Sequence, residues 1–199
     1  MTPFTPKTFS IKELDGISTK TIEEHLKLYA GYVKHTNLIL EHIDEFTQNT
    51  EKYAYELGEL QRRFSFEFDG MRNHEYYFAS LEGEATALET ASTLKAEIEK
   101  EWGSFDLWLN RFKAIALTRG IGWAILYYDP HTNRLLNAWV DEQHLGHLTG
   151  LSPILALDMW EHSYLMDYVP SQKKDYVEAF FRNLNWGVIE DNFKGVFKG

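Results

Sequence analysis

The spacing of apolar residues changes near residue 93, and this change limits the folds that the chain can adopt. Before that point Ile22, Leu26, Tyr29 and Val33 recur at steps of three and four residues, which predicts an amphipathic helix that runs past Leu40. After it, short apolar runs typical of strands follow two amphipathic stretches. The chain is therefore expected to combine a helical first half with a mixed second half.

A second helix is expected in the first half, where aromatic residues from Met71 to Phe78 follow Gly70. Residues 50–66 are polar and charged, and we interpret them as a connection or a short helix. The two helices predict a helical hairpin domain at residues 1–93.

Residues 94–199 carry the pattern of a small α+β domain. The expected elements are two helices, three strands and a last helix, at residues 95–102, 105–118, 120–129, 135–140, 153–157 and 173–192. The first two strands are joined by a turn and form a hairpin, so we predict a three-stranded antiparallel sheet flanked by helices.

Composition excludes several classes of function. The 199 residues are 44% hydrophobic, enough for one domain or two small ones that share a core. Twenty basic against thirty acidic residues leave a net charge of −10, which argues against nucleic acid or an anionic membrane as the main partner. No signal-peptide pattern is present, and no run approaches the roughly eighteen apolar residues of a membrane span, so a soluble, cytoplasmic protein is expected.

The absence of cysteine limits the chemistry further. It excludes thiol catalysis, disulfides and thiolate metal sites, and it leaves histidine and carboxylate side chains as ligands for a transition metal. Such nitrogen and oxygen ligands suit iron, manganese or zinc.

The segment D-M-W-E-H at residues 158–162 is the strongest functional signal. The apolar run at 153–157 fits a buried strand, which would deliver Asp158 to the protein interior. A buried carboxylate needs a partner, and a metal ion would supply one. His162 follows four residues later and can reach the same ion, so we interpret the pair as half of a metal site.

The ordered motifs of the chain resemble those of the iron/manganese superoxide dismutase family. The run at 158–162 is similar to the D-x-W-E-H signature of that family, and Asn73-His74 with the aromatic residues after it is similar to its N-H-x-x-F segment. Further matching segments lie at residues 21–25, 31–33, 103–105, 120–123 and 183–186. The resemblance covers nearly the whole chain and implies an N-terminal helical hairpin followed by an α+β domain, with the metal site between them.

The resemblance implies one Fe or Mn ion per chain. The implied ligands are two from the helices and two from the second domain: His25, His74, Asp158 and His162. The implied activity is superoxide dismutation, in which one-electron cycling of the ion converts superoxide, the small-molecule substrate, to dioxygen and hydrogen peroxide. A homodimer is also implied, because Glu161 is similar to the family residue that reaches the metal-ligand histidine, here His162, of the partner subunit.

Tyr32 and His144 are the implied catalytic residues. Tyr32 resembles the gateway tyrosine of the family, although it follows His25 by seven residues where the family usually has eight. The family also places a Gln or a His against the solvent molecule on the metal. Gly70 occupies the helical position for that residue here, so a loop of the second domain must supply it. His144 resembles the histidine variant, with Gln143 as the second candidate.

Two other interpretations are open. A zinc hydrolase could use His144 and His147, whose i, i+3 spacing can hold a metal with an activated water. It lacks an evident general base and explains none of the other segments. A catalytically silent protein of the same fold would be indicated by loss of a metal ligand, and all four implied ligands are present.

Overall fold

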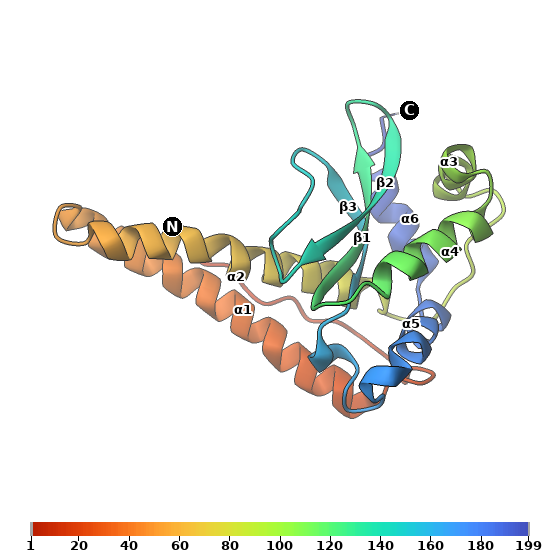
Figure 1. Ribbon diagram of the computed structural model, residues 1–199, viewed down its shortest axis with the longest axis horizontal. Coiled ribbons are helices and arrows are strands. Elements are labelled where there is room, and N and C mark those ends of the chain that lie inside the picture. The colour runs from red at the N-terminus through yellow and green to blue at the C-terminus, as the bar shows by residue number, and fades with distance from the viewer. Residues whose placement is uncertain (1, 199) are drawn as a thin grey trace.

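The computed structural model describes residues 2–198 and shows a long helical hairpin that projects from a mixed α/β body (Figure 1). Helix α1 (Thr19–Phe46) begins after Ser18, whose hydroxyl oxygen accepts the backbone N–H of Thr21 and so caps the helix. A short connection leads to α2 (Ala54–Ser80), which returns beside α1. The predicted hairpin is confirmed.

Helix α2 is longer than the sequence pattern indicated. Residues 54–66 belong to it, so the interpretation of this stretch as a connection is wrong, and Gly70 lies inside the helix. The outer part of α2 projects beyond the body, where it has little apolar surface to cover (Figure 1). Ion pairs one turn apart stabilise it instead, with 2.7 Å between Arg62 and Glu59 and 2.8 Å between Arg63 and Glu67. A helix stabilised in this way has no clear apolar stripe, so the periodicity of apolar residues does not indicate it in the sequence.

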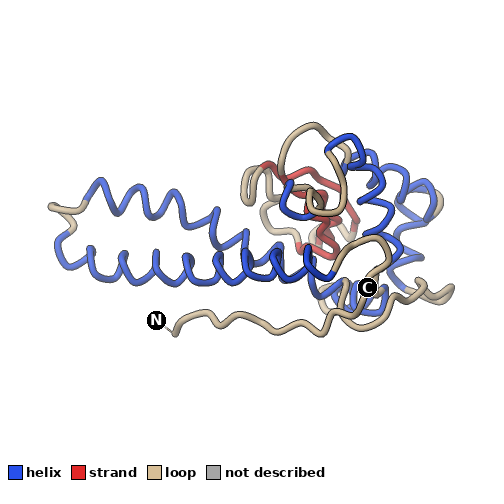
Figure 2. Tube along the Cα trace, turned by 90° about the horizontal axis from the view of Figure 1, so that it is seen from below, coloured by secondary structure: helices blue, strands red, loops and turns tan. Residues whose placement is uncertain are grey.

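The second half contains the expected sheet. Its first elements are α3 (Thr93–Trp102), α4 (Phe105–Ala116), β1 (Gly122–Asp129), β2 (Arg134–Asp141) and β3 (Ser152–Asp158). The strand order is β2-β1-β3 and both pairings are antiparallel, which confirms the predicted α+β fold class. Helices α2 and α6 pack on β3, while α3 and α4 pack on β2, so the strands lie among helices at the base of the hairpin (Figures 1 and 2).

The last part of the chain forms two helices, α5 (Lys173–Arg182) and α6 (Trp186–Lys194), where one was predicted. Asn183 ends the first, and its side-chain amide donates to the carbonyl of Ala179 at 2.7 Å. The side chain of Asn185 then caps the second. Asparagine side chains compete with backbone groups for hydrogen bonds, so two of them within three residues break the helix.

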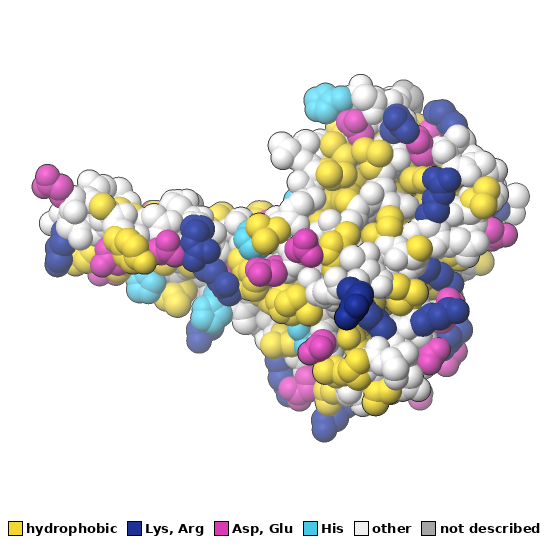
Figure 3. Space-filling model, viewed as in Figure 1, with side chains coloured by type: hydrophobic (Ala, Val, Ile, Leu, Met, Phe, Trp, Pro, Cys, Tyr) yellow, Lys and Arg dark blue, Asp and Glu magenta, His cyan; other side chains and the backbone are white. Residues whose placement is uncertain are grey.

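The halves meet close to residue 93, the first residue of α3. Their status as separate domains, 1–93 and 94–199, stays a prediction. Within residues 2–198 no helix has the length and apolar character that crossing a membrane requires. On the face shown in Figure 3, basic and acidic side chains are interspersed.

A buried carboxylate ties α6 to the start of α3 and gives a prediction about acid stability. The side chain of Glu190 accepts the backbone N–H groups of Thr93 and Leu94, at 3.0 and 3.1 Å, and the Ser92 hydroxyl. Burial alone would raise the pKa of Glu190, but these hydrogen bonds hold it below its ordinary value. A depressed carboxyl pKa stabilises the fold above the pKa of the unfolded chain, and this stabilisation is lost as pH falls through the folded-state pKa.

Glu190→Gln is therefore expected to lower the free energy of unfolding at neutral pH by about 1–2 kcal/mol. The difference from the parent protein should shrink in acid, once the pH falls through the folded-state pKa of Glu190 and the carboxylate becomes protonated. Urea unfolding at neutral and acidic pH checks this, with Asp191→Asn on the exposed side of the same helix as the control. An equal loss at both pH values would contradict the assignment.

Candidate metal centre

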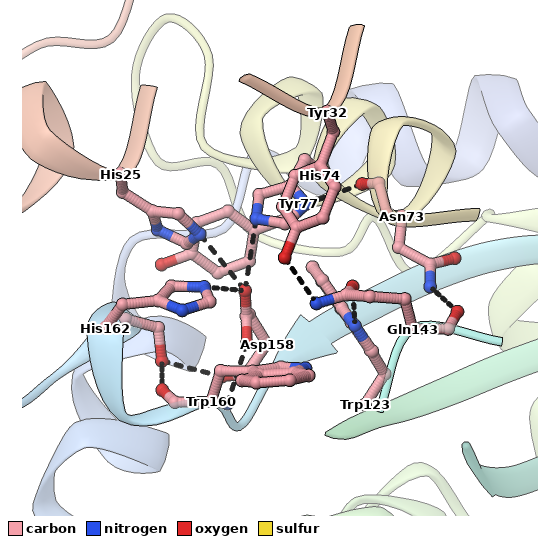
Figure 4. A network of polar contacts seen from close by, with 12 residues as sticks. His25, Tyr32, Asn73, His74, Tyr77, Trp123, Gln143, Asp158, Trp160 and His162 are labelled. Atoms are coloured by element: carbon pink, nitrogen blue, oxygen red, sulfur yellow. Dashed lines mark hydrogen bonds and ion pairs between the residues drawn. The ribbon is translucent and has the colours of Figure 1, made fainter. Parts of the chain in front are cut away.

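Four side chains converge where the hairpin meets the sheet (Figure 4). His25 comes from α1, His74 from α2, Asp158 from the end of β3, and His162 from a short 3-10 turn after it. One ligand atom from each lies within 4.8 Å of all the others. The Nε2 atoms of His25, His162 and His74 lie 3.0, 3.1 and 3.5 Å from one oxygen, Oδ2 of Asp158. The structure thus brings together the four residues that the sequence singled out.

The local chain path explains how β3 and the turn after it supply two of these groups. Residues Ile154 to Asp158 are all buried, as the apolar run predicted. The other carboxylate oxygen of Asp158 accepts the backbone N–H of Trp160 at 2.8 Å. The Ser163 hydroxyl donates to the carbonyl oxygens of Asp158 and Trp160, which turns the chain back so that His162 faces the carboxylate.

The donor set fits a metal ion. The Nδ1–H of His74 donates to the carbonyl of Gly70 at 2.5 Å, so its Nε2 keeps a lone pair. This Nε2 is buried and has no hydrogen-bond partner among residues 2–198, a costly state that a cation would relieve. Nitrogen and oxygen donors of this kind suit iron or manganese.

The charge states of the buried groups also fit a cation. Burial lowers the pKa of His25, and burial together with neighbouring His25 lowers the pKa of His74 to about 3, so both rings are neutral. Burial alone would raise the pKa of Asp158, but His162 and His25 hold it well below its ordinary value. The interior therefore contains a carboxylate whose negative charge a metal ion would balance.

Gln143 lies between Tyr32 and Trp123 beside this cluster (Figure 4). Its amide Nε2 donates to the Tyr32 hydroxyl at 2.9 Å, and its Oε1 accepts the indole N–H of Trp123 at 2.8 Å. The Tyr32 ring lies 5.0 Å from the His74 ring, between centroids. The structure thus places Tyr32 at the site despite its seven-residue separation from His25.

The preference for His144 at this place is corrected, because its ring packs against Phe66 with 5.6 Å between centroids and Gln143 faces the site instead. The backbone explains the difference. Glu142 adopts a left-handed conformation with φ of 52°, which turns the following residue inward. Non-glycine residues rarely adopt this conformation, so the sequence carries no signal for it. The residue that sequence reasoning ranked second, Gln143, is the one the fold brings to the site.

The pair His144 and His147 does not form a second metal site. His147 uses its ring nitrogens in contacts with the Tyr127 hydroxyl and the Gln143 carbonyl, at 2.6 and 3.1 Å. Among residues 2–198, the one group of three or more potential ligands gathered closely enough for an ion is the cluster around Asp158. The geometry gives no support to a zinc hydrolase.

Comparison with known proteins agrees with this geometry. The profile of the C-terminal domain of iron/manganese superoxide dismutases matches residues 90–192. A superoxide dismutase [Fe] from Aquifex aeolicus (strain VF5) is 34% identical over 196 residues, which cover 94% of this chain and 89% of that protein. The chain belongs to the iron/manganese superoxide dismutase family.

Relatives in this superoxide dismutase family are named for either metal. A superoxide dismutase [Fe] from Cupriavidus metallidurans is 40% identical over 177 residues, 87% of each chain. A superoxide dismutase [Mn] from Mycobacterium leprae is 33% identical over 170 residues, 85% of this chain and 80% of that one. Similarity at this level supports a single Fe or Mn ion and does not separate the two metals.

Two tryptophans shield the cluster. The Trp123 ring meets the His74 ring edge-on at 5.0 Å, and the Trp160 ring stacks on His162 at 5.7 Å. The indole N–H of Trp160 donates to the carbonyl of Glu142 at 3.0 Å, which ties the loop that carries Gln143 to the turn that carries His162. Sequence reasoning missed this tie, because it depends on a contact between residues far apart in the chain.

Gly70 makes room for the Tyr32 ring. A Cβ at this position would lie 2.6 Å from Cδ1 and 2.7 Å from Cε1 of that ring, closer than packed atoms approach. The space beside this helical position, which the sequence gives to Gly70, is thus filled by the ring of a tyrosine from α1. The amide comes from the loop before β3 instead.

Gly70→Ala is expected to push the Tyr32 ring away from Gln143. Overpacking of this kind costs about 1–3 kcal/mol of stability, although alanine is the better helix former. Gly58→Ala is the matched control, because it lies on the same helix with no atom within 4 Å of the added Cβ. Thermal unfolding should show a loss for the first variant and none for the second. Equal stability of the two variants would mean that the ring does not occupy this space.

Proposed function

We propose that the protein is a superoxide dismutase that holds one Fe or Mn ion at His25, His74, Asp158 and His162. The observation that carries this proposal is the convergence of three histidine nitrogens on one buried, ionised carboxylate in a chain of this family. Bound there, the ion would supply one-electron oxidation and reduction. The net reaction takes two superoxide ions and two protons to dioxygen and hydrogen peroxide.

The side chains around the cluster keep the site dry and ordered. Trp123, Trp160 and Phe78 pack against the ligand histidines, and each ligand histidine except His162 is fully buried. Exclusion of water lowers the local dielectric constant, so the carboxylate acts strongly on any nearby charge. Packed aromatic walls also fix the orientation of each imidazole.

Tyr32 carries a proton at the edge of the site, because it is partly exposed while His25, His74 and Asp158 are buried. Burial, followed by the charges of Asp158 and Glu67, raises the pKa of Tyr32 well above its ordinary value, so the phenol stays protonated. Its oxygen accepts the amide N–H of Gln143. The O–H is thereby left to donate to an oxygen of the substrate, and we assign Tyr32 and Gln143 to proton delivery.

We also propose that the protein is a homodimer that works in the cytoplasm. Glu161 is exposed beside the partly exposed His162, and Leu165 and Met166, 42% and 47% exposed, follow them. Exposed apolar side chains next to the partly exposed His162 support a subunit interface there. Sedimentation of the parent protein and of Leu165→Glu checks this, with a shift from dimer to monomer expected in the variant.

Elemental analysis of the purified protein, paired with superoxide consumption after separate reconstitution with iron and manganese, tests the activity. One metal ion per chain and rapid consumption with at least one metal are expected. A zinc-loaded chain without consumption would favour a hydrolase. A chain that binds no metal and stays inactive would indicate a silent member of the family.

A further inference from the structure

We propose that His147 is a positioning residue that fixes Gln143 beside the metal centre, at the end of a hydrogen-bond chain that begins at Tyr127. This inference rests on the proposed function, because it concerns the residue assigned there to proton delivery. His147 lies outside the ligand set, on the loop between β2 and β3, and the ligand geometry leaves it without a role.

The hydrogen bonds define the direction of the chain. The Tyr127 hydroxyl lies 2.6 Å from Nδ1 of His147 and donates to it, because the other ring nitrogen of His147 faces a carbonyl oxygen, which can only accept. The neutral imidazole then carries its hydrogen on Nε2, which donates to the carbonyl oxygen of Gln143 at 3.1 Å. The rigid strand β1, which carries Tyr127, therefore fixes the backbone of Gln143 through His147.

A second donor holds the same carbonyl and lies 3.4 Å from Nε2 of His147, so the two nitrogens approach the oxygen from neighbouring directions. The side-chain amide of Asn73, on α2 next to His74, donates to the Gln143 oxygen at 3.0 Å (Figure 4). One carbonyl thus accepts hydrogen bonds from the helical hairpin and from the sheet. Loss of His147 would leave Asn73 as the remaining side-chain anchor of this carbonyl among residues 2–198.

The loop needs such anchors because its backbone is strained. Glu142 holds φ at 52°, a conformation that is unfavourable for a non-glycine residue and persists only where its surroundings impose it. The carbonyl of Glu142 is held by Trp160, and the next carbonyl by His147 and Asn73. Without His147 the peptide after Gln143 can rotate, and the Gln143 side chain then leaves Trp123 and Tyr32.

The test uses a readout that does not depend on catalysis. The indole N–H of Trp123 donates to Gln143 at 2.8 Å, so its proton resonance and solvent exchange in the metal-free protein report whether Gln143 is in place. His147→Leu removes both bonds of the imidazole. His147→Gln can keep a donor for the carbonyl and an acceptor for the tyrosine. His131→Leu, at an exposed histidine in the turn between β1 and β2, is the matched control.

We expect the Trp123 indole proton of His147→Leu to exchange about tenfold faster than that of the parent protein, with a shift of its resonance. His147→Gln should restore slow exchange, and His131→Leu should match the parent protein. In the metal-loaded protein, His147→Leu should keep its metal, shift the reduction potential and lose about tenfold in kcat. Trp123→Phe identifies the resonance.

Unchanged exchange and potential in His147→Leu would overturn the proposal, and so would equal damage in His147→Leu and His147→Gln, which would indicate a role in shape alone. If His147→Leu does not fold, Tyr127→Phe, which removes a single hydroxyl, serves instead, and unchanged exchange there would also overturn it. Failure of the proposed function looks different. In that case the parent protein would be inactive with every metal while its Trp123 proton still exchanged slowly.

Discussion

Replacing His162 with Ala should strip the metal from the protein and abolish superoxide consumption while the fold persists. One of the three nitrogens that converge on Asp158 is lost, and the remaining groups leave the ion under-coordinated. His162 suits this experiment because its side chain is 21% exposed, whereas His25 and His74 are fully buried and their removal would also create cavities. Elemental analysis after gel filtration, with far-UV circular dichroism to follow the fold, measures the effect.

The matched control is His35→Ala, at an exposed histidine within α1. It should keep a full complement of metal and full activity. Retention of metal and activity by the His162 variant would contradict the proposed ligand set. Loss of metal and activity in the control would show that replacing an exposed histidine also damages the protein. The effect of the His162 variant could then not be attributed to a lost metal ligand.

Gln143→Leu should keep the metal and lower kcat by roughly 10–100-fold, the usual range for partners of metal sites just outside the ligands. The variant removes the donor to Tyr32 and leaves the buried indole N–H of Trp123 unpaired. It should therefore also cost about 1–3 kcal/mol of stability. Metal content, steady-state kinetics and urea unfolding together measure these effects.

His144→Leu separates the two residues that the sequence offered for this position. Its ring contacts Phe66 and makes no hydrogen bond to Gln143 or Tyr32. We expect a much smaller loss of kcat than in the Gln143 variant. A larger loss in His144→Leu would mean that the loop turns the other way when the metal is bound, and that the first choice made from the sequence was correct.

The fold and half of the metal cluster, Asp158 and His162, could be anticipated from local signals in the sequence, whereas His25 and His74 were implied by the family resemblance. A strand that delivers Asp158 to the interior and a turn that returns His162 both lie within ten residues. The strand hairpin is likewise set by an apolar run, a turn and a second run. Each of these features depends on neighbours in the chain, which a single sequence displays.

The errors arose where contacts between distant residues decide the structure. The outer half of α2 is a helix because it pairs with α1 and because charged side chains one turn apart attract, as Arg63 and Glu67 do. The inward position of Gln143 depends on a strained residue, Glu142, and on hydrogen bonds to the carbonyls of residues 142 and 143 from α2, the loop between β2 and β3, and the turn after β3. Such three-dimensional constraints leave no periodic trace in the sequence.

The ligand set also has a consequence for how the protein responds to metal supply. Two of the ligands belong to the helical hairpin and two to the α/β body, so an ion bound there would link the two halves through its coordination bonds. A ligand that binds only the closed, folded chain stabilises it by mass action, by about 2.7 kcal/mol at a hundredfold excess over its dissociation constant. Removal of the metal should therefore destabilise the contacts between the two halves more than the core of either half. The rate of amide hydrogen exchange should rise first along α1 near His25.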